Sequence, residues 1–245
     1  MSGKKIENYY ISRKPKLLKN FDKTANIVRK IVISRYGEEF AHTILKETRQ
    51  EFEALIPHIP HIRGSTPALR TFLIISAWEL AAYKAMKKHG KGAKEAWELC
   101  HEVLKVRLKT VPTFVCHLLT SLFFSSFVKK RARKIAEKTQ KHPLGDFTFK
   151  FVEGDSENFD WGVDYTGCSI YKFMCDHDAK EFAPYVCLSD IALSDTLGWG
   201  LIRTETLAEG AERCDFRFKK GGKTKISSTV WGKGHYILLL AYLTI

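Results

Sequence analysis

The 245-residue sequence lacks several features that would narrow its function at once: a Cys-x-x-Cys pair, an export signal, an internal repeat and a low-complexity segment. Structural zinc sites usually take thiolates from closely spaced pairs, so we expect no metal centre and no other cofactor. The first residues, MSGKKIENYY, are charged and have no apolar segment. This start predicts a cytoplasmic protein whose six cysteines are reduced thiols.

A long uninterrupted apolar run is also missing. The stretch Val111–Val128 is interrupted by a proline, a histidine and several hydroxyl side chains, so it favours a buried helix and we expect no stable membrane insertion. A helix lying in a membrane interface is the alternative, because the basic run Lys129–Lys134 follows. The terminal YILLLAYLTI is too short to cross a bilayer and predicts either a final strand or a tail packed on the core.

Charge is distributed unevenly along the chain. Of the net +13, residues 1–142 carry 29 Lys and Arg against 12 Asp and Glu, whereas residues 143–245 carry 11 against 15. We therefore expect a basic part over 1–142 and an acidic part over 143–245, joined in one compact unit. The aromatic residues do not interleave with Lys and Arg as they do in nucleic-acid-binding modules, so no nucleic-acid partner is expected.

Hydrophobic periodicity predicts an α+β fold, with a helical N-terminal half followed by a mixed α/β C-terminal half with antiparallel strands and a terminal hairpin. Helices are expected over Glu38–Leu55, Ala68–His89, Ala93–Leu108, Thr113–Gln140, Gly167–Asp176 and Pro184–Leu197. Strands are expected over Phe147–Val152 and Phe159–Tyr165, and the hairpin over Trp199–Leu207 and Arg213–Lys219.

The stretch EGAERCDFRFKKGG, near the end of the chain, has two interpretations. Strand alternation sends Cys214, Phe216 and Phe218 to one face and Asp215 and Arg217 to the other. The charges could form a salt ladder with Arg203 and Glu205 of the preceding strand, which requires no functional role. Alternatively, the strand contributes a thiol and charges to a site.

Two other segments carry side chains suited to catalysis. With Thr166 as N-cap, Cys168 would lie in the first turn of a helix, where the helix dipole lowers a thiol pKa and creates a nucleophile. A small buried side chain at a strand–helix junction is the alternative. On the next helix Cys187, Asp190 and Ser194 form a polar stripe, and Asp190 is the carboxylate best placed to accept a proton.

Ordered motifs over about Phe40 to Gly222 resemble the L-2-amino-thiazoline-4-carboxylic acid hydrolase family. In the second half these are FVEG (151–154), DYTGC (164–168), PYVCLSD (184–190), RTETLAEG (203–210) and CDFRF (214–218). In the first half, IPHIRG (59–64) and AAYK (81–84), followed by Gly90, are similar to its helical portion. The family often has an acidic residue before the first cysteine, where this chain has Gly167. If that acid is the proton carrier, this departure predicts a weakened or altered activity.

The resemblance implies hydrolysis of a carbon–nitrogen bond in a small cyclic amidine, opening an amino-thiazoline ring to a carbamoyl-cysteine on a route to L-cysteine. The attacking group would be the Cys168 thiolate or a water deprotonated by Asp190. An arginine, Arg217 or Arg203, would hold the substrate carboxylate. We therefore predict Cys168, Asp190 and Cys214 as catalytic and Asp215, Arg217, Arg203 and Cys187 as substrate-binding residues.

Two other functions fit the sequence. The C-terminal half is distantly similar to 4-vinyl reductase-type domains, which suggests a non-catalytic small-molecule-binding or sensor domain. The basic run Lys129–Lys134 would serve a protein associated with membranes or nucleic acids. An enzyme requires turnover, whereas a binding domain requires only stabilisation by its ligand.

Overall fold

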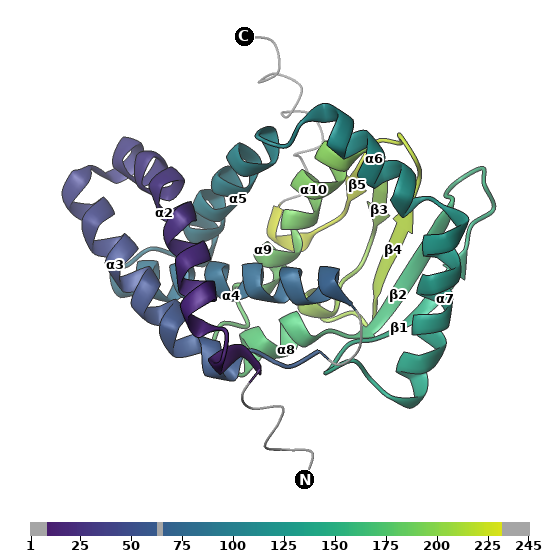
Figure 1. Cartoon of the computed structure of the whole chain (residues 1–245), viewed down its shortest axis with the longest axis horizontal. Helices are drawn as coiled ribbons and strands as arrows, with labels where there is room; N and C mark the ends of the chain where they lie inside the picture. The colour runs from purple at the N-terminus through teal and green to yellow at the C-terminus, as the bar shows by residue number, and fades with distance from the viewer. Residues whose placement is uncertain (1–8, 63–65, 232–245) are drawn as a thin grey trace.

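The computed structural model describes residues 9–62 and 66–231 (Figure 1). The predicted tail over 236–245 lies outside the described residues, as do Arg63 and Gly64 of the IPHIRG motif. The first half is helical, as predicted, with helices joined by short connections. They are α2 (Lys14–Tyr36), α3 (Glu38–Leu55), the 3₁₀ helix η1 (Ile56–His58), α4 (Pro67–Lys88), α5 (Ala93–Lys109), α6 (Thr113–Phe123) and α7 (Ser126–Lys141).

The predicted single helix over Thr113–Gln140 is wrong, because the chain turns between α6 and α7. Ser125 is the N-cap of α7, and its Oγ accepts a hydrogen bond from the Val128 backbone N–H at 3.2 Å. A serine hydroxyl that satisfies a backbone N–H at a helix start favours a new helix over continuation of the old one.

The prediction that Val111–Val128 is buried is also wrong for one side of α6. Cys116 is buried, but Phe114 is 72% exposed and further apolar side chains of α6 and the start of α7 face outward. Among the described residues, no helix is both long and apolar enough to cross a membrane.

The second half forms a five-stranded sheet in the order β1-β2-β4-β3-β5. Neighbouring strands are antiparallel except for β3 and β5, which are parallel. The α+β class and the antiparallel β3–β4 hairpin are therefore confirmed, with β5 as an additional edge strand. The strands are β1 (Thr148–Glu153), β2 (Trp161–Gly167), β3 (Leu201–Arg203), β4 (Cys214–Phe218) and β5 (Lys225–Ile226).

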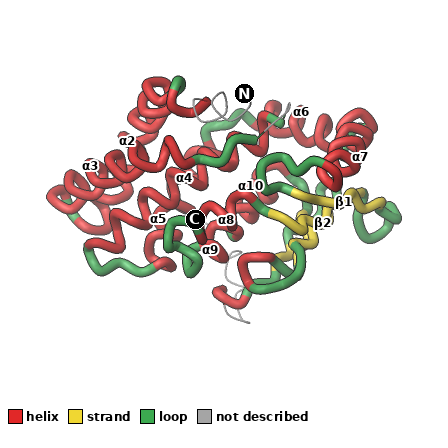
Figure 2. Tube along the Cα trace, turned by 90° about the horizontal axis from the view of Figure 1, so that it is seen from below, coloured by secondary structure: helices red, strands yellow, loops and turns green. Residues whose placement is uncertain are grey.

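Short helices connect the strands. They are α8 (Ser169–Cys175), α9 (Ala183–Cys187), α10 (Ser189–Leu197), and the 3₁₀ helices η2 (Leu207–Glu209) and η3 (Thr229–Trp231). The predicted helix over Pro184–Leu197 is divided at Leu188, so Cys187 and Asp190 lie on different helices. In Figure 2 strands β1 and β2 lie at one side of the molecule and most of the helices at the other.

An aromatic cluster joins the helical half to the sheet. The ring of Phe123, at the end of α6, lies 4.8 Å from that of Trp161 on β2 and 4.6 Å from that of Trp199 before β3. It also meets Phe218 on β4 edge to face at 4.9 Å. On the β1 side, Thr139 of α7 exchanges hydrogen bonds with the backbone of Phe149. The face of the sheet that carries Trp161 and Phe218, called the inner face below, therefore packs against helices.

Candidate functional site

The register of the sheet divides the four predicted site residues that lie on strands between its two faces. Cys214 of β4 lies opposite Tyr165 of β2, and side chains opposite each other on paired strands share a face. Cys214 therefore points to the inner face. Asp215, its neighbour, lies opposite Asp164 and points to the outer face, as the strand alternation of the sequence predicts.

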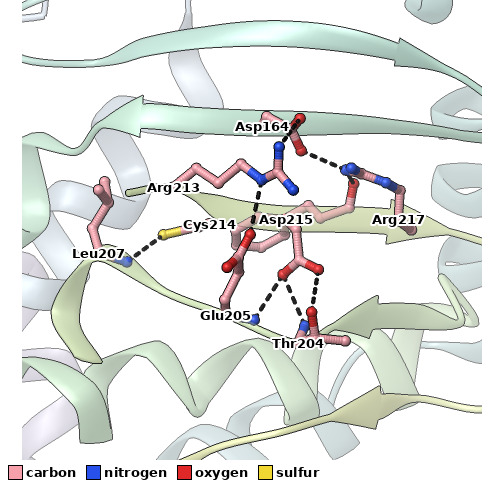
Figure 3. Close-up of polar contacts among 9 residues, drawn as sticks. Asp164, Thr204, Glu205, Leu207, Arg213, Cys214, Asp215 and Arg217 are labelled. Carbon is pink, nitrogen blue, oxygen red and sulfur yellow. Dashed lines mark hydrogen bonds and ion pairs between the residues drawn. The ribbon is translucent and has the colours of Figure 1, made fainter. Parts of the chain in front are cut away.

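The outer-face charges form a salt ladder (Figure 3). Arg217 Nη1 donates to Asp164 Oδ1 at 2.7 Å, and Arg213 donates to Glu205 at 2.8 Å. Asp215 accepts hydrogen bonds from the backbone N–H groups of Thr204 and Glu205 at 2.8 and 2.9 Å, and from the Thr204 hydroxyl at 2.6 Å. These contacts fix the loop after β3 to β4, which is a structural role.

Asp215 and Arg217 therefore cannot share a pocket with the inner-face thiols, because the sheet separates them. The structure therefore does not bring these two predicted substrate-binding residues together with Cys168. Arg203 also departs from the sequence interpretation, because it does not take part in the ladder. It follows Leu201, which lies opposite Phe218, so strand alternation places it on the inner face.

Arg203 is the largest buried polar side chain of the second half, with 1% of its surface exposed. Its Nη1 donates to Asp190 Oδ2 at 2.5 Å, and its Nη2 donates to the Cys187 carbonyl oxygen at 3.0 Å. The guanidinium carbon lies 5.2 Å from the centre of the Phe216 ring. Within the described part of the chain its Nε–H has no hydrogen-bond partner. A buried guanidinium with an unpaired N–H carries a free-energy cost, which a hydrogen-bond acceptor such as a water or a ligand would remove.

Asp190 lies in the first turn of α10 and keeps 31% of its side chain exposed. Burial nevertheless raises the pKa of this carboxyl, and the attraction of Arg203 offsets that effect only in part. Only Oδ2 is engaged by Arg203, and no donor from the described residues contacts Oδ1. Asp190 thus combines accessible surface, a free oxygen and an increased affinity for a proton.

Three thiols lie near this ion pair. Cys168, Cys187 and Cys214 come from the start of α8, the end of α9 and β4. Burial raises the pKa of all three thiols, and the charge of Asp190 adds to the effect at each, which places the carboxylate within electrostatic reach of each. The structure therefore brings together five of the seven predicted residues. We call Cys168, Cys187, Asp190, Arg203 and Cys214 the inner-face cluster.

Burial opposes the predicted activation of Cys168. Cys168, and not Thr166, is the N-cap of α8, and its sulfur accepts a hydrogen bond from the Tyr171 backbone N–H at 3.5 Å. That contact favours the thiolate, but burial dominates and, with Cys214 and Asp190 nearby, raises the pKa of the thiol to about 12. A helix start lowers a thiol pKa only where the site does not remove its hydration.

The other thiols follow the same pattern. Burial raises the pKa of Cys214, whose sulfur accepts a hydrogen bond from the Leu207 backbone N–H at 3.2 Å. Burial also raises the pKa of Cys187 well above its usual range. Ser194, the third member of the predicted polar stripe, contacts Thr224 and the Leu201 backbone instead. The cluster is therefore a site of neutral thiols beside one ion pair.

Sequence reasoning missed a second carboxyl. Glu79 of α4 is 7% exposed and accepts a hydrogen bond from the Ser189 hydroxyl at 3.1 Å, one residue before Asp190. Burial, together with the charge of Asp190, raises the pKa of Glu79 to about 8. The signal in the sequence was a single acid in an otherwise apolar stretch, FLIISAWELAAY (72–83).

Metal ligation is not supported by the geometry. Within 9–62 and 66–231, no group of three or more His, Cys, Asp or Glu side chains is arranged to hold an ion. The inner-face cluster instead presents one cationic and one anionic group, a combination suited to a small zwitterionic molecule.

Comparison with known proteins identifies one family. A family model described as L-2-amino-thiazoline-4-carboxylic acid hydrolase matches residues 72–218. The matched segment extends from α4 to β4 and contains the whole inner-face cluster and Glu79. No curated protein and no solved structure matches the chain.

Proposed function

The chain belongs to the L-2-amino-thiazoline-4-carboxylic acid hydrolase family, and from this premise we propose that it hydrolyses a carbon–nitrogen bond in a small cyclic amidine. The thiazoline acid is the reference substrate. Water adds to the ring carbon between nitrogen and sulfur, the bond from that carbon to the ring nitrogen breaks, and the product is a carbamoyl-cysteine. Such a product would serve the formation of L-cysteine.

The charges of the substrate support this proposal. The thiazoline acid carries a carboxylate and a basic amidine, and the inner-face cluster offers Arg203 and Asp190 side by side. Arg203 keeps one N–H unpaired for the carboxylate, and a protonated amidine is the natural partner of Asp190. Arg217, the other candidate for the carboxylate, is committed to Asp164 on the outer face.

We assign proton transfer to Asp190. Its raised pKa makes it a better proton acceptor than an ordinary aspartate, and its Oδ1 has no donor among the described residues. The carboxylate takes a proton from water as the water oxygen bonds to the ring carbon. It then returns the proton to the ring nitrogen as the carbon–nitrogen bond breaks, so that one water molecule is consumed and the residue is regenerated.

Activated water is favoured over thiolate attack, and what carries this choice is the placement of Cys168 near Cys214 and Asp190, where burial raises the pKa of the thiol to about 12. At neutral pH the thiol is protonated, and the thiolate is the nucleophilic form. Cys168 and Cys214 then border the reacting carbon and limit access of bulk water. Gly167 stands in place of the acidic residue frequent in the family, so this chain has no carboxyl directly before Cys168.

Asp190→Asn tests the assignment. We expect it to lower kcat for ring opening by about 100-fold or more, the usual contribution of a positioned acid or base. The matched control is Asp195→Asn, an exposed aspartate on the same helix, which should keep full activity. Full activity in Asp190→Asn would reject the proposed role.

Cys168→Ser separates the two nucleophiles. With activated water, kcat should fall by no more than about ten-fold, whereas loss of a covalent nucleophile removes nearly all activity. Near-complete loss in a folded Cys168→Ser protein would replace the water route with the thiolate route.

The raised thiol pKa values favour one alternative, a non-catalytic small-molecule-binding domain. Such a domain would show a ligand-dependent rise in Tm without ring opening. Measuring turnover and Tm with the thiazoline acid on the wild-type chain distinguishes the two functions.

A further inference from the structure

The apolar side chains exposed at the surface are concentrated in one segment. Of the large hydrophobic residues that are exposed in the described part of the chain, every one except Ile11 lies between residues 106 and 127. They are Val106, Phe114, Leu118, Leu119, Leu122 and Phe127. Single exposed apolar residues are common on proteins, but a group of this kind usually marks an interaction surface.

Three of these side chains form a stripe along α6. Phe114, Leu118 and Leu122 are spaced at i, i+4 and i+8 and lie on one side of the helix. The opposite side holds α6 to the protein, since Cys116 is buried and the Thr120 hydroxyl donates to the Leu197 carbonyl oxygen. The stripe is thus directed outward by a helix that is packed on its other side, along one edge of the molecule in Figure 1.

The chain segment that carries the stripe has charge of one sign. Residues 103–136 contain eight Lys and Arg and no Asp or Glu. At the start of α7, Phe127 shares a helix side with Lys130 and Lys134, at i, i+3 and i+7. Phe127 is 66% exposed, and both lysines are exposed without an ion pair in the part of the chain that the structure describes. The apolar stripe of α6 therefore continues into a basic patch on α7.

We propose that α6 and the first turns of α7 bind the surface of an anionic lipid membrane. Apolar side chains would enter the boundary between headgroups and acyl chains, and the lysines would meet the negative headgroups. Nucleic acid would satisfy the lysines but leave the leucines exposed, and a second copy of the chain would bring like charges together. The eleven residues of α6 lie along the membrane, since about twenty are needed to span it.

Vesicle sedimentation of the full chain tests this proposal. Wild-type protein should bind vesicles of phosphatidylcholine with about 30% phosphatidylserine, and binding should weaken in vesicles of phosphatidylcholine alone and in high salt. Phe114→Gln/Leu118→Gln/Leu122→Gln should lower the partition coefficient at least about ten-fold. Lys130→Glu/Lys134→Glu should lower it by a similar factor without altering the apolar stripe.

Ile11→Gln is the matched control, because Ile11 is an exposed apolar residue outside the segment, and it should bind like wild type. The proposal is overturned if wild type ignores anionic vesicles, or if the α6 variant binds them equally well. It is also overturned if Leu238→Gln/Leu239→Gln/Leu240→Gln abolishes binding and the α6 variant does not, which would assign binding to the C-terminal segment. Conversion of a dimer to a monomer by the α6 variant, with no vesicle binding, would assign the stripe to self-association.

Discussion

The wild-type protein should lose stability as pH rises from about 4.5 to 8, and Glu79→Gln should abolish that pH dependence. Burial raises the pKa of Glu79 from 4.5 to about 8, so in this window the folded state holds a proton that the unfolded state has released. Stability falls with pH wherever the folded state binds more protons. The stabilising effect of the proton is therefore complete below pH 4.5 and lost by about pH 8.

The size of the effect follows from the shift. Each pKa unit corresponds to about 1.4 kcal/mol, so the change from 4.5 to about 8 corresponds to about 5 kcal/mol. This is a large part of the 5–15 kcal/mol typical of a folded domain. A neutral glutamine keeps an oxygen acceptor for the Ser189 hydroxyl, which lies 3.1 Å from the glutamate oxygen, and it does not titrate.

Urea unfolding followed by circular dichroism at pH 5, 7 and 8.5 measures the effect. The free energy of unfolding should fall with pH in wild type, and the fall should be smaller in Glu79→Gln by about 3–5 kcal/mol. Glu137→Gln, at an exposed site on α7, should keep the wild-type slope. Equal slopes in wild type and Glu79→Gln would refute the reasoning.

Three further predictions concern the site and its frame. Arg203→Met should lower the free energy of unfolding by about 3 kcal/mol, because it leaves Asp190 unpaired. Adding Asp190→Asn should restore at least about 1 kcal/mol of that loss in urea titrations, and additive losses would contradict the ion pair. Alkylation of Cys168 by iodoacetamide at pH 8, followed by mass spectrometry, should be about a thousand-fold slower than that of a free cysteine, and rapid alkylation at neutral pH would show that its pKa is not raised. Gly200→Ala should lower the free energy of unfolding by at least about 2 kcal/mol, because Gly200 has φ +55° and a Cβ there would lie 2.1 Å from a carbonyl oxygen. The control Gly198→Ala, at φ +60° with open space around it, should lower it by about 1 kcal/mol. Equal losses would be inconsistent with the close contact at Gly200.

Local patterns predicted most of the fold. Strand alternation in CDFRF correctly placed Cys214 and Asp215 on opposite faces, and helical periodicity located α3 at its observed ends. The predictions of single helices across Ser125 and Leu188 failed. At these positions a cap or a change of direction ends a helix although the apolar pattern continues. Hydrophobic periodicity shows which side of a helix is buried, but it contains little information about where one helix ends and the next begins.

The candidate site was harder to predict, because its chemistry depends on burial. The position of Cys168 at a helix start was correctly expected, but the direction of its pKa shift was not, since burial and the nearby Cys214 and Asp190 arise only in the folded chain. The family resemblance grouped Asp215 and Arg217 with the thiols, although alternation along the same strand already separated Asp215 from Cys214. Glu79 was missed because its partner, Ser189, is 110 residues away.

The comparison of Arg203→Lys with Arg217→Lys tests most directly whether the inner face of the sheet is where substrate binds. Both variants keep a positive charge, and each removes one planar guanidinium from one face. With the thiazoline acid as substrate, we expect Arg203→Lys to lower kcat/KM at least about ten-fold and Arg217→Lys to leave it unchanged in the folded protein. A loss confined to Arg217→Lys would contradict the placement of the site on the inner face.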